Sequence, residues 1–185
     1  MTITVLNKGE RMSILSIKNI SKFYTLDGKH QEQALKNINL QIAKGKITAI
    51  YGPSGCGKTS LLNIISGLDR QYEGDLEFKG ESLRDLSEIE LTQFRKDKIG
   101  FVFQNFKLIQ NNTILENVSI PLIYNGMSSK DRKAKVLKGL EDVGLHQKED
   151  LLPNKLSGGQ QQRVAIARAI INDLNLSLPM SQQGH

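Results

Sequence analysis

The chain has 185 residues, of which 38% are hydrophobic and 24% are charged, and its formal net charge is +6 at pH 7. This composition is typical of one soluble globular domain. It excludes a membrane-spanning chain, because no apolar run approaches the ~18 residues that a bilayer requires. The basic residues are dispersed along the sequence, so the positive charge does not indicate a nucleic-acid partner. The single cysteine excludes an internal disulfide and is typical of a reducing cytosol.

Residues 1–13 are expected to be a leader outside the folded domain, because the alternating pattern of a first strand begins only at residues 12–17. Residues 8–10 can be encoded by the purine-rich string AAAGGAGAA, which resembles a bacterial ribosome-binding site just upstream of Met12. One hypothesis is therefore that Met12 is the true start of the protein. The alternative is a short disordered extension.

The next part of the chain predicts an α/β unit. Residues 14–24 and 35–42 have the pattern of two antiparallel strands, and residues 26–29 form a turn between them. Residues 46–51 are short, mostly apolar and followed by Gly52, which predicts a buried parallel strand.

A phosphate-binding loop follows this strand. Its pattern, G-x-x-x-x-G-K-[ST], is matched by Gly52, Pro53, Ser54, Gly55, Cys56, Gly57, Lys58 and Thr59. The glycines allow backbone amides to point at phosphate oxygens at the start of a helix, predicted over residues 57–66 with Gly67 just past its end. Lys58 would supply a charge to the β- and γ-phosphates, Thr59 would ligate Mg²⁺, and Ser60 would reach the α-phosphate. The loop therefore predicts a site for ATP and Mg²⁺.

Further elements follow the loop. Residues 74–79 and 98–104 predict two more strands, with a helix over residues 86–96 between them. A capping box at residues 128–131 predicts the start of another helix. The apolar face of that helix is expected to contain Ala134, Leu137, Leu140 and Val143.

A second glycine-rich segment opens the amphipathic run at residues 161–170. It consists of Leu156, Ser157, Gly158, Gly159 and Gln160. Ser157 occupies the position of an N-cap hydroxyl, and the glycines leave amides exposed at the positive end of the helix dipole. The segment predicts a second phosphate-binding helix start, and the alternative is an ordinary glycine-rich cap.

Together the two motifs resemble the ATP-binding-cassette (ABC) ATPases, and the resemblance covers residues 14–173. It implies an α/β fold: a P-loop NTPase (RecA-like) core with an antiparallel β subdomain and a helical signature subdomain. It also implies a head-to-tail dimer in which residues 156–160 of one subunit contact the ATP held by the other. Tyr24 falls where the family stacks an aromatic ring on adenine, the alternative being an ordinary strand residue. Gln104 matches the family's Q-loop glutamine, which contacts Mg²⁺ and reports to the membrane subunit.

Residues 83–95, 100–106 and 113–118 resemble one branch in particular, which contains macrolide-export, lipoprotein-release, antimicrobial-peptide-export and cell-division-type ATPases. The branch implies an ATP-binding subunit that drives transport through an integral membrane permease. It would lie in the cytoplasm, on the inner face of the plasma membrane. Two alternatives remain: a non-transport ABC ATPase acting on ribosomes or DNA, and a non-functional truncated product.

The resemblance ends after Asp173. Members of the branch would continue with Pro, an apolar strand and Asp-Glu-Pro-Thr-Gly, whereas residues 174–185 differ. With a suitable choice of synonymous codons, one C inserted after the Asp173 codon restores the family's sequence, so a frameshift is one explanation and a natural variant tail is the other. The Walker B Asp, the catalytic Glu and the switch His are absent, and the C-terminal part of the core is expected to be missing. The missing family strand would be central in the sheet, so its neighbours are expected to have unpaired edges. Hydrolysis is therefore expected to be deficient, because the attacking water lacks its base.

Overall fold

The computed structural model describes residues 4–6, 13–26, 28–172 and 176–180. The chain forms two compact units, Met1–Gln93 and Phe94–His185. None of the described helices combines the length and the hydropathy that a membrane span requires.

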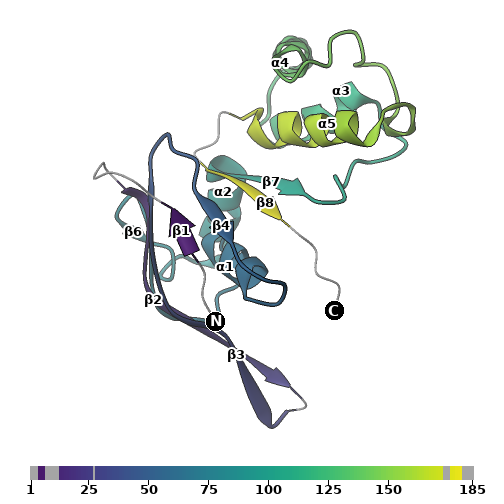
Figure 1. Ribbon diagram of the computed structural model, residues 1–185. Coiled ribbons are helices and arrows are strands. Elements are labelled where there is room, and N and C mark those ends of the chain that lie inside the picture. Colours follow the sequence, from purple (N-terminus) through teal and green to yellow (C-terminus); the bar gives the residue numbers. More distant parts are fainter. Residues whose placement is uncertain (1–3, 7–12, 27, 173–175, 181–185) are drawn as a thin grey trace. The chain divides into compact units, whose positions relative to one another are not determined.

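The first unit is built on a four-stranded antiparallel sheet (Figure 1). Its two long strands, β2 (Ser13–Leu26) and β3 (His30–Ala43), form a hairpin, and β5 (Glu73–Phe78) and β6 (Glu81–Ser82) extend the sheet in the order β3-β2-β5-β6. At the hairpin turn Gly28 has a φ of 68°, a conformation that glycine adopts without steric cost. The predicted antiparallel β subdomain is confirmed, and both strands of the hairpin are longer than the sequence predicts.

Helix α1 (Lys58–Ile65) packs its apolar face into the same unit, and it is one residue shorter at each end than predicted. Gly67 follows its C-cap with a φ of 68°, and its N–H donates to Ile64 O at 2.9 Å. The N–H of Leu68 donates to Asn63 O, also at 2.9 Å. These two bonds define a Schellman motif and confirm the predicted position of Gly67. The largest fully buried side chains of this unit are Leu15, Ile17, Ile20, Leu35, Leu61, Ile64, Ile65, Leu76 and Leu91.

The strand predicted at residues 46–51 differs from expectation. Only β4 (Ala49–Tyr51) is a strand, and it pairs antiparallel with β1 (Thr4–Leu6). Ile47 is 97% exposed, so the prediction of a buried parallel strand was wrong. A buried parallel strand needs neighbours on both edges and helices over its faces, and among the described residues β4 pairs with one strand only. The segment predicted as a leader contributes β1, and the hypothesis that Met12 is the start remains untested.

The second unit combines three helices with a two-stranded parallel sheet (Figure 1). Helix α2 (Glu88–Lys98) runs across the boundary into it. Its further elements are β7 (Ile99–Phe103), α3 (Ile114–Tyr124), α4 (Ser129–Asp142), a 3-10 turn (Pro153–Lys155), α5 (Gly158–Ile170) and β8 (Leu176–Met180). Buried residues of its core include Ile114, Val118, Leu122, Val136, Leu140, Leu145, Leu156, Val164, Ala165 and Ala167.

Helix α3 was not predicted. It begins at a complete capping box, in which Thr113 Oγ1 accepts from Glu116 N–H and the Glu116 carboxylate accepts from Thr113 N–H. This Thr-x-x-Glu spacing is readable in the sequence. Pro121 lies inside the helix, and an internal proline weakens a helix prediction because it removes one backbone hydrogen bond.

Ser128 is the N-cap of helix α4, where the sequence predicts a helix start, but the buried face of the helix differs from the prediction. Ser128 Oγ accepts from Asp131 N–H, while the Asp131 carboxylate accepts from the Ser128 hydroxyl instead of closing a full box. Val136 and Leu140 are buried, whereas Leu137 is 37% exposed. The prediction placed Leu137 on the buried face, whereas the structure places Val136 there. The spacing of apolar residues along a helix is compatible with either choice.

The tail contributes a strand to the second unit. Strand β8 pairs in parallel with β7, from Ile99 opposite Leu176 to Phe103 opposite Met180. The expectation that the loss of the family strand would leave its neighbours with unpaired edges was therefore wrong for this edge of β7. Residues 176–180 can form this strand because backbone hydrogen bonds between strands depend little on side-chain identity. Leu178, at the centre of β8, is also buried.

Candidate functional site

The glycine-rich loop before α1 is shaped by Gly57. This residue is the N-cap of α1 and has a φ of 86°, in the left-handed region. A Cβ at this position would lie 2.5 Å from Ala34 O and 2.7 Å from Leu35 Cδ2. Only glycine satisfies both the conformation and the close approach of β3. The loop is therefore fixed against the hairpin of its own unit.

Lys58 lies folded over this loop. Its Nζ donates to Gly52 O at 2.8 Å and to Pro53 O at 2.7 Å, and it lies 3.5 Å from Cys56 Sγ. The Cys56 side chain is buried, with 1% exposed. The ammonium is thus held at the loop by neutral acceptors, and an anion would compete well for it because charge-assisted hydrogen bonds are stronger.

The N-terminus of α1 has the properties of an anion site. No side chain caps this helix, and its first turn contains no acidic residue. The first amides of a helix have no intrahelical partner, and the helix dipole places positive potential there. Thr59 and Ser60 lie in this first turn and are partly buried. Together with Lys58, the helix start can bind a phosphate chain.

The structure brings Tyr24 to this helix. The Tyr24 hydroxyl donates to Ser60 Oγ at 3.0 Å, and the side chain remains 38% exposed. Tyr24 lies near the end of β2, at a place where Glu32 of β3 is opposite. An exposed aromatic side chain therefore lies beside the start of α1.

The second glycine-rich segment forms the start of α5. Ser157 is its N-cap: Ser157 Oγ accepts from Gln160 N–H at 3.4 Å, and Gln160 Oε1 accepts from Ser157 N–H at 3.0 Å. The predicted N-cap is confirmed. Gly158 and Gly159 are exposed, whereas Leu156 is buried in the core of the second unit. Leu156 therefore anchors the segment in the core, while Ser157, Gly158 and Gly159 are exposed to solvent.

Gln104 follows β7 in an exposed turn. Two and three residues further on, Phe106 and Lys107 have φ values of 55° and 48°, which residues other than glycine rarely adopt. Arg168 of α5 holds them: its guanidinium donates to Lys107 O at 2.8 Å and to Phe106 O at 2.7 Å. Burial lowers the pKa of this guanidinium. Arg168 was not predicted from the sequence to have a role. The feature that indicates one is its position between Ala167 and Ala169, which are both buried.

The described residues contain no group of three or more His, Cys, Asp and Glu side chains that could hold a metal ion. The two predicted Mg²⁺ ligands, Thr59 and Gln104, carry oxygen atoms of the kind that Mg²⁺ prefers. They belong to different units of the chain.

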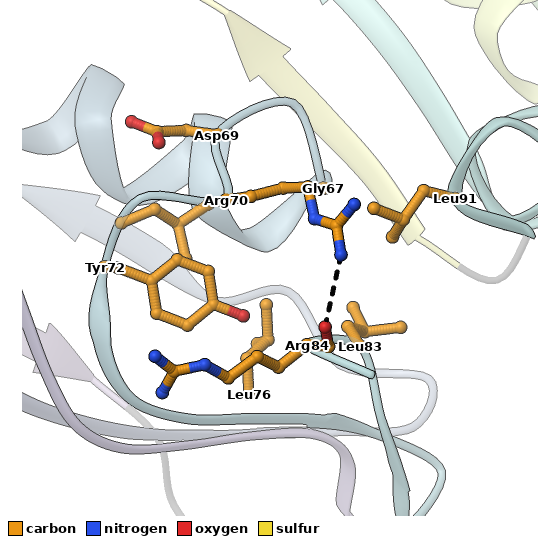
Figure 2. Close-up of a pocket in the computed structure, with 9 residues that line it drawn as sticks. Gly67, Asp69, Arg70, Tyr72, Leu76, Leu83, Arg84 and Leu91 are labelled. Atoms are coloured by element: carbon orange, nitrogen blue, oxygen red, sulfur yellow. Dashed lines mark hydrogen bonds between the residues drawn. The ribbon is translucent and has the colours of Figure 1, made fainter. Parts of the chain in front are cut away.

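A separate cavity of about 190 Å³ lies in the first unit and contains no residue of the phosphate loop (Figure 2). Its arginines are already engaged. Arg70 donates to Arg84 O at 3.4 Å (Figure 2). It also donates to Glu88 Oε1 at 3.0 Å and to Leu86 O at 2.8 Å. Burial raises the pKa of Tyr72 in the same cavity. Its lining residues are Ile64, Gly67, Asp69, Arg70, Tyr72, Leu76, Leu83, Arg84 and Leu91.

Comparison with known proteins identifies close relatives. The sequence profile described as "ABC transporter" matches residues 35–178. An uncharacterized ABC transporter ATP-binding protein of Methanocaldococcus jannaschii, MJ0796, is 46% identical over 164 residues, which cover 86% of this chain and 69% of that protein. The macrolide export ATP-binding/permease protein MacB of Neisseria gonorrhoeae is 42% identical over 161 residues, covering 87% of this chain and 25% of MacB.

The fold agrees with that of solved structures. The dimeric structure of the MJ0796 cassette superimposes with a TM-score of 0.78 at 44% identity, covering 89% of this chain and 72% of that one. A second MJ0796 structure, a dimer in a post-hydrolysis state bound to ADP and Pi, superimposes with the same TM-score of 0.78.

Proposed function

This chain belongs to the ABC transporter family as an ATP-binding domain, and from that premise we propose that its loop at residues 52–60 binds the triphosphate of Mg-ATP. Lys58 pairs with the β- and γ-phosphates, the backbone N–H groups of the loop and of the first turn of α1 donate to phosphate oxygens, and Ser60 reaches the α-phosphate. The observation that carries the proposal is the uncapped start of α1 with Lys58 folded over it.

Mg²⁺, when bound with ATP, neutralises charge on the phosphates. The Thr59 hydroxyl and the Gln104 carboxamide are the side chains of this chain that we assign to it. Tyr24 is assigned to the adenine, because its exposed ring stands beside the phosphate-binding helix start and hydrogen-bonds Ser60. Aromatic rings stack on nucleobases without needing hydrogen-bond readout.

Titration with ATP, followed calorimetrically, tests this assignment. Lys58→Ala is expected to abolish detectable binding because the triphosphate loses its charge clamp. Gln104→Ala should leave affinity nearly unchanged. Lys46→Ala removes an exposed lysine of the same unit and controls for the loss of net charge. Equal affinity in the wild type and Lys58→Ala would contradict the proposed loop.

We further propose that residues 157–160 contact the γ-phosphate of ATP held by a second copy, giving a head-to-tail dimer. Support comes from the exposed glycines at the start of α5 and from the dimeric MJ0796 cassette. Gly158→Asp would place a negative charge there, so it should prevent ATP-dependent dimerisation while the monomer keeps its ATP affinity. Light scattering after size exclusion, with and without ATP, measures this. An unchanged dimer in the variant would contradict the proposal.

The membrane partner is also a proposal. We propose that the chain binds an integral membrane permease and thereby lies on the cytoplasmic face of the plasma membrane. MacB, whose name combines ATP-binding and permease functions, supports this partner. Co-purification of the tagged protein with a membrane protein from detergent extracts tests it. Recovery of ribosomes or DNA in place of a membrane protein would favour a non-transport ABC ATPase.

For turnover, we propose that this sequence binds ATP without hydrolysing it. Strand β8, which pairs with β7, consists of Leu176–Met180 and carries no carboxylate. Loss of a general base alone costs about 10²–10⁴ in rate. Phosphate release with Mg-ATP should therefore equal background, also with a permease present. Turnover that disappears in Lys58→Ala would contradict this.

A further inference from the structure

Lys22 is a buried cation two residues before Tyr24. Its residue is 2% exposed, which is rare for lysine. Its Nζ lies 2.9 Å from Asp69 Oδ2 and 3.0 Å from Asp69 Oδ1. A buried charge is tolerated only when it is paired and hydrogen-bonded, so this pair is a specific feature of the first unit.

Asp69 is itself fixed in position. Its Oδ1 accepts from Gln71 N–H at 2.9 Å, and its own N–H donates to Asn63 O of α1 at 3.1 Å. Its carboxylate points away from the neighbouring Arg70 guanidinium (Figure 2). The carboxylate therefore forms its ion pair with Lys22, and this pair links β2 to the segment that follows α1.

Lys22 also contacts the Tyr24 ring. Residues two apart on a strand share one face, and Lys22 Nζ lies 4.9 Å from the centroid of the ring. The Tyr24 hydroxyl is held by Ser60 at 3.0 Å. The ring is thus fixed by its backbone in β2, by a cation against the ring and by a hydrogen bond at its tip, while 38% of the residue stays exposed.

We propose that Lys22 and Asp69 are positioning residues that hold the Tyr24 ring ready for the nucleotide base. The inference rests on the proposed function, in which Tyr24 stacks on adenine. A ring that is already ordered loses less conformational freedom when a base stacks on it, so affinity rises without a direct contact to the base. Removal of Lys22 should therefore weaken the binding of ligands that carry a base, and only those.

The experiment compares ATP with inorganic triphosphate, which has the phosphates but no base. In Lys22→Met the affinity for ATP should fall about 3- to 10-fold, and the affinity for inorganic triphosphate should be unchanged. In a Tyr24→Leu background, Lys22→Met should cause no further loss. Lys18→Met is the matched control: Lys18 also lies on β2 and pairs with Glu77 at 2.9 Å, but its side chain is 53% exposed. It should leave both affinities unchanged.

Lys22→Met leaves Asp69 without its partner, which would itself destabilise the fold. The double variant Lys22→Met/Asp69→Leu removes both charges and is expected to fold and to show the same base-selective loss. Thermal unfolding monitors the fold of every variant.

Four results would overturn the proposal. If the double variant binds both ligands like the wild type, Lys22 does not position the ring. An equal loss of affinity for ATP and inorganic triphosphate would give Lys22 a structural role only. If Tyr24→Leu itself fails to separate ATP from inorganic triphosphate, the adenine site of the proposed function fails, and this inference fails with it. Base-selective loss in Tyr24→Leu but not in either Lys22 variant rejects this inference alone.

Discussion

The two glycine-rich helix starts, at α1 and at α5, resemble each other in sequence and differ in construction. At α1 the shape comes from the backbone: Gly57 is left-handed, it approaches Ala34 closely, and no side chain caps the helix. At α5 a reciprocal capping box between Ser157 and Gln160 completes the turn. The first start keeps its anion-binding potential for a ligand and carries its own cation, Lys58. The second satisfies two backbone N–H groups, those of Ser157 and Gln160, internally and has exposed glycines without a lysine, which suits a site completed by another molecule.

The largest expected effect is on stability, when one glycine at the start of each helix is replaced by alanine. Gly57→Ala forces a Cβ to within 2.5 Å of Ala34 O at a left-handed φ, so it should lower the free energy of unfolding by about 2–4 kcal/mol and abolish ATP binding. At Gly159 an added Cβ meets nothing within 4 Å, so Gly159→Ala should leave stability unchanged or raise it by up to about 1 kcal/mol. Chemical denaturation measures both. Similar stability changes would remove the distinction between the two starts.

The next largest effect on stability is expected from Arg168, near the C-terminal end of α5. Arg168→Met removes two charged hydrogen bonds to the backbone of the loop after β7, so the free energy of unfolding should fall by about 2–3 kcal/mol. Hydrogen exchange at residues 104–107 should also become faster. Arg163→Met changes an exposed arginine on the same helix and should stay within about 0.5 kcal/mol of the wild type. A comparable loss in the control would mean that helix charge, and not the loop, is responsible.

A smaller effect is expected from the cap of α5. Ser157→Ala removes the hydroxyl that accepts from Gln160 N–H, which should cost about 1 kcal/mol of stability. The ATP affinity of the monomer should not change, because the phosphate loop belongs to α1. Calorimetric titration of the monomer measures the second point. Weaker ATP binding by the Ser157→Ala monomer would show that the start of α5 also contributes to the ATP site at α1.

The smallest effect concerns pH. Helix α2 begins at a cap like that of α5, but Glu90 replaces the glutamine: its carboxylate accepts from Ser87 Oγ and Ser87 N–H, both at 2.7 Å. These bonds lower the pKa of Glu90. A carboxyl with a lowered pKa stabilises the fold above its ordinary pKa, and this contribution is lost as pH falls through the folded value. The amide resonance of Ser87 should therefore titrate in the acidic range. That of Ser157, capped by a neutral glutamine, should not, and parallel titration of both would contradict this.

The sequence alone determined the local features of this protein. The hairpin, the phosphate loop, the Schellman glycine Gly67 and the N-cap at Ser157 were all predicted, because each depends on residues that are neighbours in the chain. The capping box that opens α3 was readable in the same way and was missed. The position of Tyr24 on its strand was also readable, although its hydrogen bond to Ser60 was not.

Only the tertiary structure decided the features that join distant segments. Strand β4 has the composition of a buried parallel strand, yet its partner is β1 and its pairing is antiparallel. The loss of the family strand was expected to leave its neighbours with unpaired edges, but β8 pairs with β7. Lys22 meets Asp69 across 47 positions, and Arg168 reaches carbonyls 61 and 62 positions away. Hydrophobic periodicity and caps act over one or two turns of chain, whereas the partner of a strand edge or of a buried charge is chosen by which distant segments the folded chain brings together.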